Sequence, residues 1–137
     1  MNFQSLFVDE ALNRYRPMWV FFQMAVFSIG LLSWMAGGVG VNSFSPETWG
    51  AWACQFPAAA WAGTQMSAAA LTMGGLFRPV SRWKVIIGAS VQALQFGALA
   101  YSAVFTGGQF VISVWPILFL VPAHLTLAWQ GYRYVPR

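Results

Sequence analysis

Four long stretches of apolar residues alternate with short polar segments along the chain. The stretches cover about residues 17–41, 49–77, 83–106 and 110–129. A helix needs about 20 apolar residues to cross the hydrocarbon core of a bilayer, and each stretch reaches that length. We therefore predict an all-α, integral membrane four-helix bundle that forms a single domain over residues 1–137.

The segments between the stretches are predicted to be tight loops. Residues 42–48 form the first loop, residues 78–82 the second, and the glycine pair 107–108 the third. Pro17 suits the first turn of a helix, where the N–H that proline lacks would have no partner. Pro57 interrupts the second stretch.

Residues 1–16 precede the first stretch and form a sizeable polar segment. Apolar residues recur within it at helical spacing: Phe3, Leu6, Phe7 and Ala11. This pattern predicts a short amphipathic helix that lies on the membrane surface. The alternative is that the segment extends the first membrane helix. We expect no cleaved signal peptide, because Asp9 and Glu10 precede an apolar run longer than the roughly 7–15 residues of a signal sequence.

The composition favours a membrane location. Hydrophobic residues make up 58% of the chain and charged residues 7%, whereas a soluble domain carries about 25% charged residues. So few charges cannot cover the surface of a water-soluble fold, and contact with the lipid bilayer removes that requirement. The net charge of +4 comes from basic residues scattered among the predicted helix ends, so we expect no nucleic-acid partner.

The basic residues predict the orientation of the helices. With four spans, all seven lie on one side of the membrane: Arg14, Arg16, Arg78, Arg82, Lys84, Arg133 and Arg137. The two loops on the other side contain no basic residue. Because cytoplasmic loops carry the excess of lysine and arginine, we predict a multi-pass protein of the bacterial inner membrane with both termini in the cytoplasm.

The predicted spans offer little chemistry. No aspartate, glutamate, lysine or arginine lies deep inside a span, and such residues mark the ion pathways of pumps and transporters. A small transporter is therefore disfavoured. Cys54 is the single cysteine, which excludes an intrachain disulfide and a cysteine metal cluster. No acid–histidine pair is suited to activating a nucleophile, so we expect neither an enzyme nor a metal site.

His124 is the only histidine, and it lies in the fourth stretch. An imidazole in a membrane helix can be an axial ligand of haem or of the magnesium of a chlorophyll. The chain has no second histidine for bis-histidine ligation of haem. We favour a structural role for His124, in which it hydrogen-bonds a neighbouring helix or reaches the cytoplasmic interface, and expect no cofactor, with ligation as the alternative.

Gln92 and Gln95 are three residues apart in the third stretch, so they share a helix face. Amide side chains in lipid prefer a partner on another helix. The pair predicts a polar seam, which either lines a hydrated pore or holds neighbouring helices together. Other glutamines occur in the first two stretches: Gln23, Gln55 and Gln65.

The second stretch is rich in small residues at four-residue intervals. Ala59, Gly63 and Ser67 form one series, and a parallel series runs one residue further on: Ala60, Thr64 and Ala68. This small-xxx-small pattern lets helix backbones approach closely in a membrane. It predicts a helix-packing surface, used either inside one chain or between copies.

The layout resembles small four-span membrane proteins encoded by tailed bacteriophages, some of which are holins. The features that carry the resemblance are the short N-terminal helix, a Ser45-Pro46 turn that leads to Trp49, an arginine-bearing inner loop, and a tryptophan-rich end with a basic tail. The residues of the last two features are Arg78, Arg82, Trp129, Arg133 and Arg137. The resemblance implies a membrane-acting protein and carries over no catalytic residue.

Together these features predict a non-enzymatic inner-membrane protein that associates with copies of itself as a homo-oligomer. A holin-like pore former is the sharpest version of this hypothesis. The alternative is an accessory subunit of a larger respiratory or photosynthetic membrane complex, with other membrane subunits as partners.

Overall fold

The computed structural model describes the chain apart from residues 1–2, 5–9, 39–45, 109–114 and 136–137. The described part is all-α. Its four long helices are α1 (Ala11–Gly38), α3 (Ala58–Leu76), α4 (Arg82–Phe105) and α5 (Trp115–Arg133). A short helix α2 (Pro46–Trp49) and a 3-10 turn η2 (Ala53–Gln55) lie between α1 and α3. The predicted all-α four-helix arrangement is confirmed.

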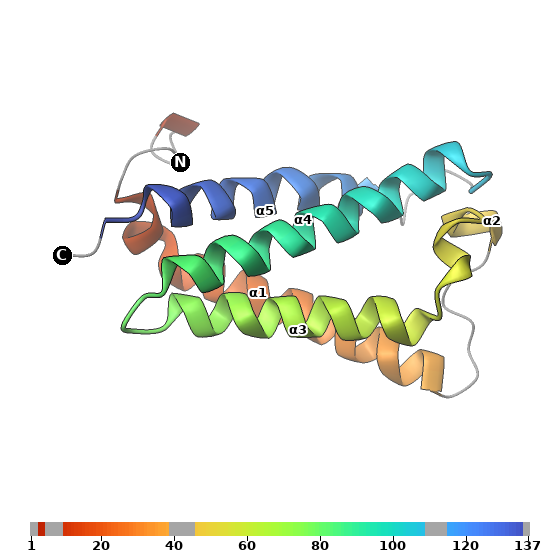
Figure 1. Ribbon diagram of the computed structural model, residues 1–137, viewed down its shortest axis with the longest axis horizontal. Helices are drawn as coiled ribbons and strands as arrows, with labels where there is room; N and C mark the ends of the chain where they lie inside the picture. Colours follow the sequence, from red (N-terminus) through yellow and green to blue (C-terminus); the bar gives the residue numbers. More distant parts are fainter. Residues whose placement is uncertain (1–2, 5–9, 39–45, 109–114, 136–137) are drawn as a thin grey trace.

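Successive long helices run in opposite directions along the long axis of the molecule (Figure 1). α3 packs between α1 and α4, and α5 packs along the other side of α4. α1 and α5 meet over a smaller area. Both termini and the α3–α4 loop therefore lie at one end of the bundle, while α2 and the end of α4 lie at the other (Figure 1).

The first helix begins earlier than its proline suggests. α1 starts at Ala11 and continues through Pro17, so residues 11–16 extend this helix instead of forming a separate surface helix. The side chains of Ala11 and Leu12 are fully buried, and Leu12 joins a core cluster with Trp19. Burial of these side chains offsets the backbone hydrogen bond that a proline removes from a helix interior. The predicted interfacial helix otherwise falls largely outside the described residues.

The third helix begins later than its apolar pattern suggests. α3 starts at Ala58, with Pro57 as its extended N-cap residue, whereas the apolar stretch begins near residue 49. Proline disfavours a helical conformation in the residue before it, and Phe56 is accordingly extended. The chain before Pro57 instead turns across the end of α4, where the Ala53 N–H donates to the Ser102 hydroxyl at 2.8 Å.

Two apolar clusters form the interior of the bundle. One lies near the end that holds the termini and includes Leu12, Trp19, Leu76, Val85, Ala89 and Leu127. The other includes Val26, Ala53, Ala69, Phe96 and Leu99. Small residues allow the helices to approach closely around these clusters. A Cβ atom added to Gly88 of α4 would lie 2.8 Å from the Ala68 carbonyl oxygen of α3.

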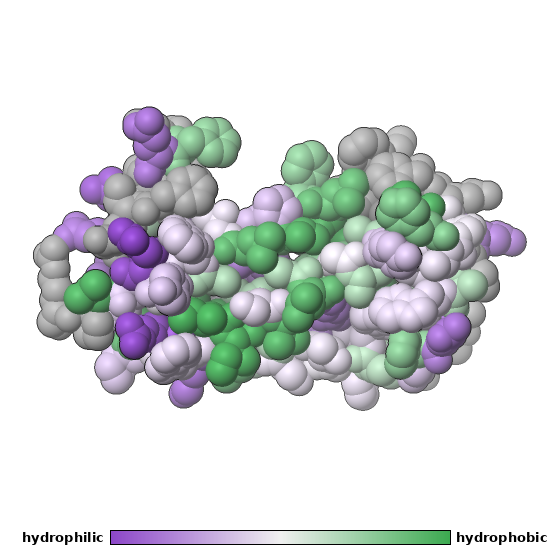
Figure 2. Space-filling view, turned by 45° about the horizontal axis from the view of Figure 1, so that its top comes forward, coloured by the Kyte–Doolittle hydropathy of each residue, from purple (hydrophilic) through white to green (hydrophobic). Residues whose placement is uncertain are grey.

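The surface separates charged and apolar residues along the long axis. The described basic residues belong to the start of α1, the α3–α4 loop, the start of α4 and the end of α5: Arg14, Arg16, Arg78, Arg82, Lys84 and Arg133. All of these positions are at the end that holds the termini. Figure 2 shows strongly hydrophilic residues gathered there, a smaller hydrophilic group at the opposite end, and a mostly apolar surface between them.

Candidate functional site

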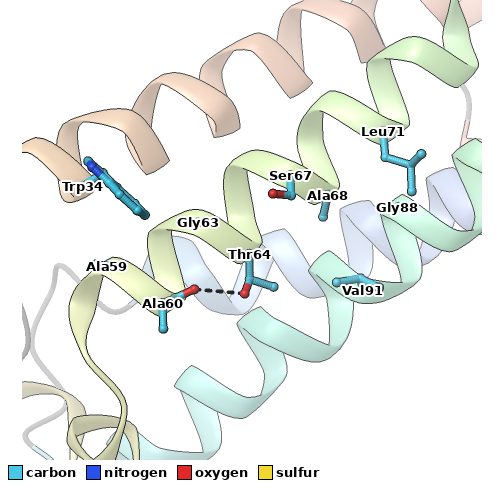
Figure 3. A pocket seen from close by; sticks show the side chains of 10 residues that line it. All are labelled: Trp34, Ala59, Ala60, Gly63, Thr64, Ser67, Ala68, Leu71, Gly88 and Val91. Atoms are coloured by element: carbon cyan, nitrogen blue, oxygen red, sulfur yellow. Dashed lines mark hydrogen bonds between the residues drawn. The ribbon is translucent and has the colours of Figure 1, made fainter.

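A groove of about 670 Å³ follows the outer face of α3. Small residues of α3 form its floor: Ala59, Ala60, Gly63, Thr64, Ser67 and Ala68. Trp34 of α1 borders one side and Val91 of α4 the other (Figure 3). The groove exists because a helix of small side chains lies between two helices with larger ones. The structure thus brings Ala59, Gly63 and Ser67 together on one accessible surface.

The edges of this groove also take part in packing within the chain. A Cβ atom added to Gly63 would lie 3.2 Å from the ring of Trp34, so this glycine gives the tryptophan room to lie against α3. Thr64 is exposed, and its hydroxyl donates to the Ala60 carbonyl oxygen at 2.9 Å (Figure 3). That bond satisfies the hydroxyl within its own helix, so Thr64 can face an apolar partner at little cost.

Small residues on the opposite side of α3 serve the interior. Ala62, Ala69, Thr72 and Gly75 are buried. Thr72 lies where α3 touches Gly88 of α4, the position at which a side chain on residue 88 would collide with it. The small residues of α3 therefore have two roles: one set lets α1 and α4 pack closely against α3, and the other lines the open groove.

Gln92 and Gln95 lie in the interior and bond to different helices. The Gln92 amide nitrogen donates to the Gln23 side-chain oxygen of α1 at 2.9 Å. The Gln95 amide nitrogen donates to the Trp61 carbonyl oxygen of α3 at 2.7 Å. The Gln65 amide nitrogen of α3 donates to the Val26 carbonyl oxygen of α1, also at 2.7 Å. In the isolated chain, this polar seam joins α1, α3 and α4 to one another.

A fourth buried link connects α1 with α5. The Trp19 indole N–H donates to the Gln130 side-chain oxygen at 2.7 Å. Sequence reasoning singled out neither member of this pair for a hydrogen bond. Gln130 lies one residue past the fourth apolar stretch. Helical spacing shows which residues share a face but does not show which face of another helix they meet.

His124 lies fully buried between two phenylalanine rings. The ring centres of Phe22 and Phe96 lie 5.1 and 5.3 Å from that of the imidazole. The histidine Nδ1 lies 2.7 Å from the Leu120 carbonyl oxygen. A carbonyl oxygen only accepts, so Nδ1 carries the proton and donates, which leaves Nε2 of the neutral ring as an acceptor.

Several buried polar atoms have no hydrogen-bond partner among the described residues. They are Gln23 Nε2, Gln92 Oε1, Gln95 Oε1 and His124 Nε2. Three of them are acceptors, and the remaining one is a donor. Within the same part of the chain, no group of three or more histidine, cysteine or acidic side chains is placed to hold a metal ion.

Two helices are long and apolar enough to cross a membrane, α1 over Ala11–Met35 and α4 over Arg82–Phe105. Helices in the core of a soluble protein can meet the same criterion, so length and composition alone do not place the protein in a membrane. No family model, no curated protein and no solved structure matches the chain.

Proposed function

We propose that the protein is a non-enzymatic protein of the bacterial inner membrane, which crosses the bilayer with four helices and associates with copies of itself. The proposal rests on the distribution of side chains in the bundle, with polar side chains inside and apolar ones outside. Fully or almost fully buried polar side chains include Gln23, Gln92, Gln130 and His124. Large apolar side chains along the helices are exposed, including Phe21 at 73%, Leu94 at 74% and Phe119 at 69%. Lipid accepts such a surface, whereas water does not favour it.

The charges support the same arrangement. The described basic residues lie at one end of the bundle, which is the end that the positive-inside rule places in the cytoplasm. Arg82 and Arg133 lie beside tryptophan rings, with guanidinium carbons 5.2 Å from the ring of Trp83 and 6.0 Å from that of Trp129. Tryptophan and arginine side chains are both favoured at the level of the lipid headgroups.

The α3 groove is the surface that we assign to self-association. Helices in lipid associate through close packing and interhelical hydrogen bonds, because lipid tails are as apolar as the side chains they would replace. Small residues let backbones approach, and the floor of the groove consists of such residues. A second copy that presents the same face would place two α3 helices against each other across a two-fold axis.

A holin-like, membrane-permeabilising assembly is the sharpest form of this proposal. Each glutamine of the polar seam bonds to a neighbouring helix within one chain, and in this form of the proposal the water path forms between copies. The exposed hydroxyl-bearing residues Thr64 and Ser67 lie on the surface where copies would meet. An accessory subunit of a larger membrane complex would use the same groove for a different partner.

Leakage and cross-linking on expression test the proposal. Ser67 is exposed on the groove floor, so Ser67→Leu should weaken association severalfold, on the order of 1 kcal/mol per lost contact. Both cross-linked dimers and the loss of membrane potential should fall. Ser28→Leu is the matched control, because Ser28 is exposed on α1 and does not line the groove. Gly63→Leu should resemble Ser67→Leu, with an added disturbance of Trp34.

Two results would contradict the proposal in different ways. If the wild-type protein accumulates in the membrane without permeabilising it, even after an energy poison, the holin-like form is wrong. If it also fails to cross-link to itself but purifies with a larger complex, self-association is wrong and the accessory-subunit alternative replaces it.

A further inference from the structure

A second cavity, of about 320 Å³, lies between the start of α1 and the end of α3. Val20 and Phe21 of α1 line it together with Leu76 and Phe77 at the end of α3. Arg16 and Arg78 also line it. The two helices are antiparallel here, so both arginines lie towards the end of the bundle, and Val20 and Phe21 lie further along the helices. The cavity is therefore cationic at its outer end and apolar further in.

Among the described residues, no opposite charge lies at this cavity. No carboxylate lines it, and among the described residues neither Arg16 nor Arg78 has a hydrogen-bond or ion-pair partner. Arg82 and Arg133 differ, because each lies beside a tryptophan ring. At the end of α3, the carbonyls of Met73 and Gly75 accept bonds from the N–H groups of Phe77 and Ser81.

We propose that this cavity binds one anionic phospholipid of the cytoplasmic leaflet. The phosphate lies between Arg16 and Arg78, and the beginning of an acyl chain lies against Val20, Phe21 and Phe77. Guanidinium groups pair with phosphate oxygens through two parallel hydrogen bonds, and basic side chains near the membrane surface favour anionic lipids. The proposal rests on the membrane insertion proposed above, which places this end of the bundle at headgroup level.

The geometry favours a lipid over a free anion for two reasons. The apolar part of the cavity would remain unfilled by inorganic phosphate, whereas it fits a hydrocarbon chain. Phe21 and Phe77 are also strongly exposed, at 73% and 59%, and a chain lying against them would cover apolar surface next to the charge pair. A zwitterionic lipid could use the same apolar surface, but its ammonium group would oppose the arginines.

The experiment compares two variants with the same change in net charge. Full-length protein would be purified in detergent and titrated with phosphatidylglycerol, and bound lipid would be counted by native mass spectrometry. The test variant is Arg16→Gln/Arg78→Gln. The control is Arg82→Gln/Arg133→Gln, which removes two charges at the same end without touching the cavity. Phosphatidylcholine and inorganic phosphate serve as comparison ligands.

The wild-type protein should retain one phosphatidylglycerol that survives mild activation in the spectrometer. The test variant should bind it roughly 30-fold more weakly, which corresponds to about 1 kcal/mol for each arginine. The affinity of the control variant for phosphatidylglycerol should fall by less than about 3-fold. Circular dichroism of each variant checks that the helices remain folded, and an Arg16→Lys/Arg78→Lys variant, which keeps the charge, should recover part of the affinity.

Three results would overturn the lipid site. Equal losses of phosphatidylglycerol affinity in the test and control variants would mean that the lipid is attracted to the basic end in general. Equal binding of phosphatidylcholine would remove the role of charge, and displacement of the lipid by millimolar inorganic phosphate would mean a site for the free anion. Failure of the membrane proposal is distinguishable, because protein extracted from membranes by alkaline carbonate would show that insertion itself is wrong.

Discussion

Each buried glutamine amide in the interior joins two helices, so the stability of the bundle depends on single residues. Gln92 and Gln23 are both fully buried, and one hydrogen bond of 2.9 Å links them. Interhelical bonds of this kind contribute on average about 0.6 kcal/mol in a membrane. Removing one partner costs more, because the other is left buried and unpaired.

A double-mutant cycle on this pair tests the role of the seam. Gln92→Leu should lower the free energy of unfolding by about 1–3 kcal/mol, since Gln23 loses its partner. Gln23→Leu/Gln92→Leu should recover much of that loss, because no unpaired amide remains. Unfolding in mixed micelles, followed by circular dichroism, measures both. Gln55→Leu, at an exposed glutamine, should change stability by less than about 0.5 kcal/mol. Purely additive losses in the double variant would show that the two amides act independently.

Gly88 is one of the glycines that let α3 and α4 approach closely. A Cβ at Gly88 would lie 2.8 Å from the Ala68 carbonyl oxygen and would collide with Thr72, whereas a Cβ at Gly97 of the same helix meets nothing within 4 Å. Gly88→Ala should therefore destabilise the bundle by about 1–3 kcal/mol by forcing the two helices apart. Gly97→Ala should be neutral or stabilise it by up to about 1 kcal/mol, because alanine favours a helix. Thermal unfolding of both variants measures the difference, and similar melting temperatures would mean that α3 and α4 adjust freely.

The helices themselves follow from the apolar pattern, but their ends do not. The prolines predict that the first helix starts at Pro17 and that the second apolar stretch is interrupted at Pro57. α1 nevertheless continues back to Ala11, because Leu12 finds a buried position against residues distant in sequence. At Pro57 the local signal prevails, and the preceding chain bonds to Ser102. Local preferences are visible in a sequence, whereas the tertiary contacts that overrule them are not.

For the polar seam and the α3 groove, the sequence predicts which residues share a helix face. It does not predict which residues of other helices they contact. The spacing of Gln92 and Gln95 placed them together, but their partners, Gln23 and the Trp61 carbonyl, depend on how three helices are arranged. The four-residue spacing of Gly63 and Ser67 indicated a packing surface. It could not show that this series lines an open groove while Ala62, Ala69 and Thr72 are buried. The Arg16–Arg78 cavity joins residues far apart in sequence, and no local pattern marks it.

The molecule as a whole combines a polar interior, an apolar surface around its middle and a basic end. No one of these features is specific to membranes, since soluble bundles also contain buried amides and apolar helices. Their combination along one axis is what a bilayer requires: hydrocarbon beside the middle, headgroups beside the arginines and tryptophans, and backbone hydrogen bonds closed within helices. In the proposed membrane arrangement, the orientation of the bundle follows from where the charges lie.

Reporter fusions test that orientation directly. Alkaline phosphatase is active only outside the cytoplasm, so fusions at Glu47 and at Gly107 should be active. Both positions are exposed and lie at the end of the bundle that carries no described basic residue. Fusions after Arg78 and after Arg137 should be inactive, because the positive-inside rule holds those segments in the cytoplasm. A green fluorescent protein fused at the same four positions should give the opposite pattern, which controls for expression. Alkaline phosphatase activity at both Glu47 and Arg137 would place the two positions on the same side. That requires an even number of crossings between them, whereas the four-span arrangement has three, α3, α4 and α5.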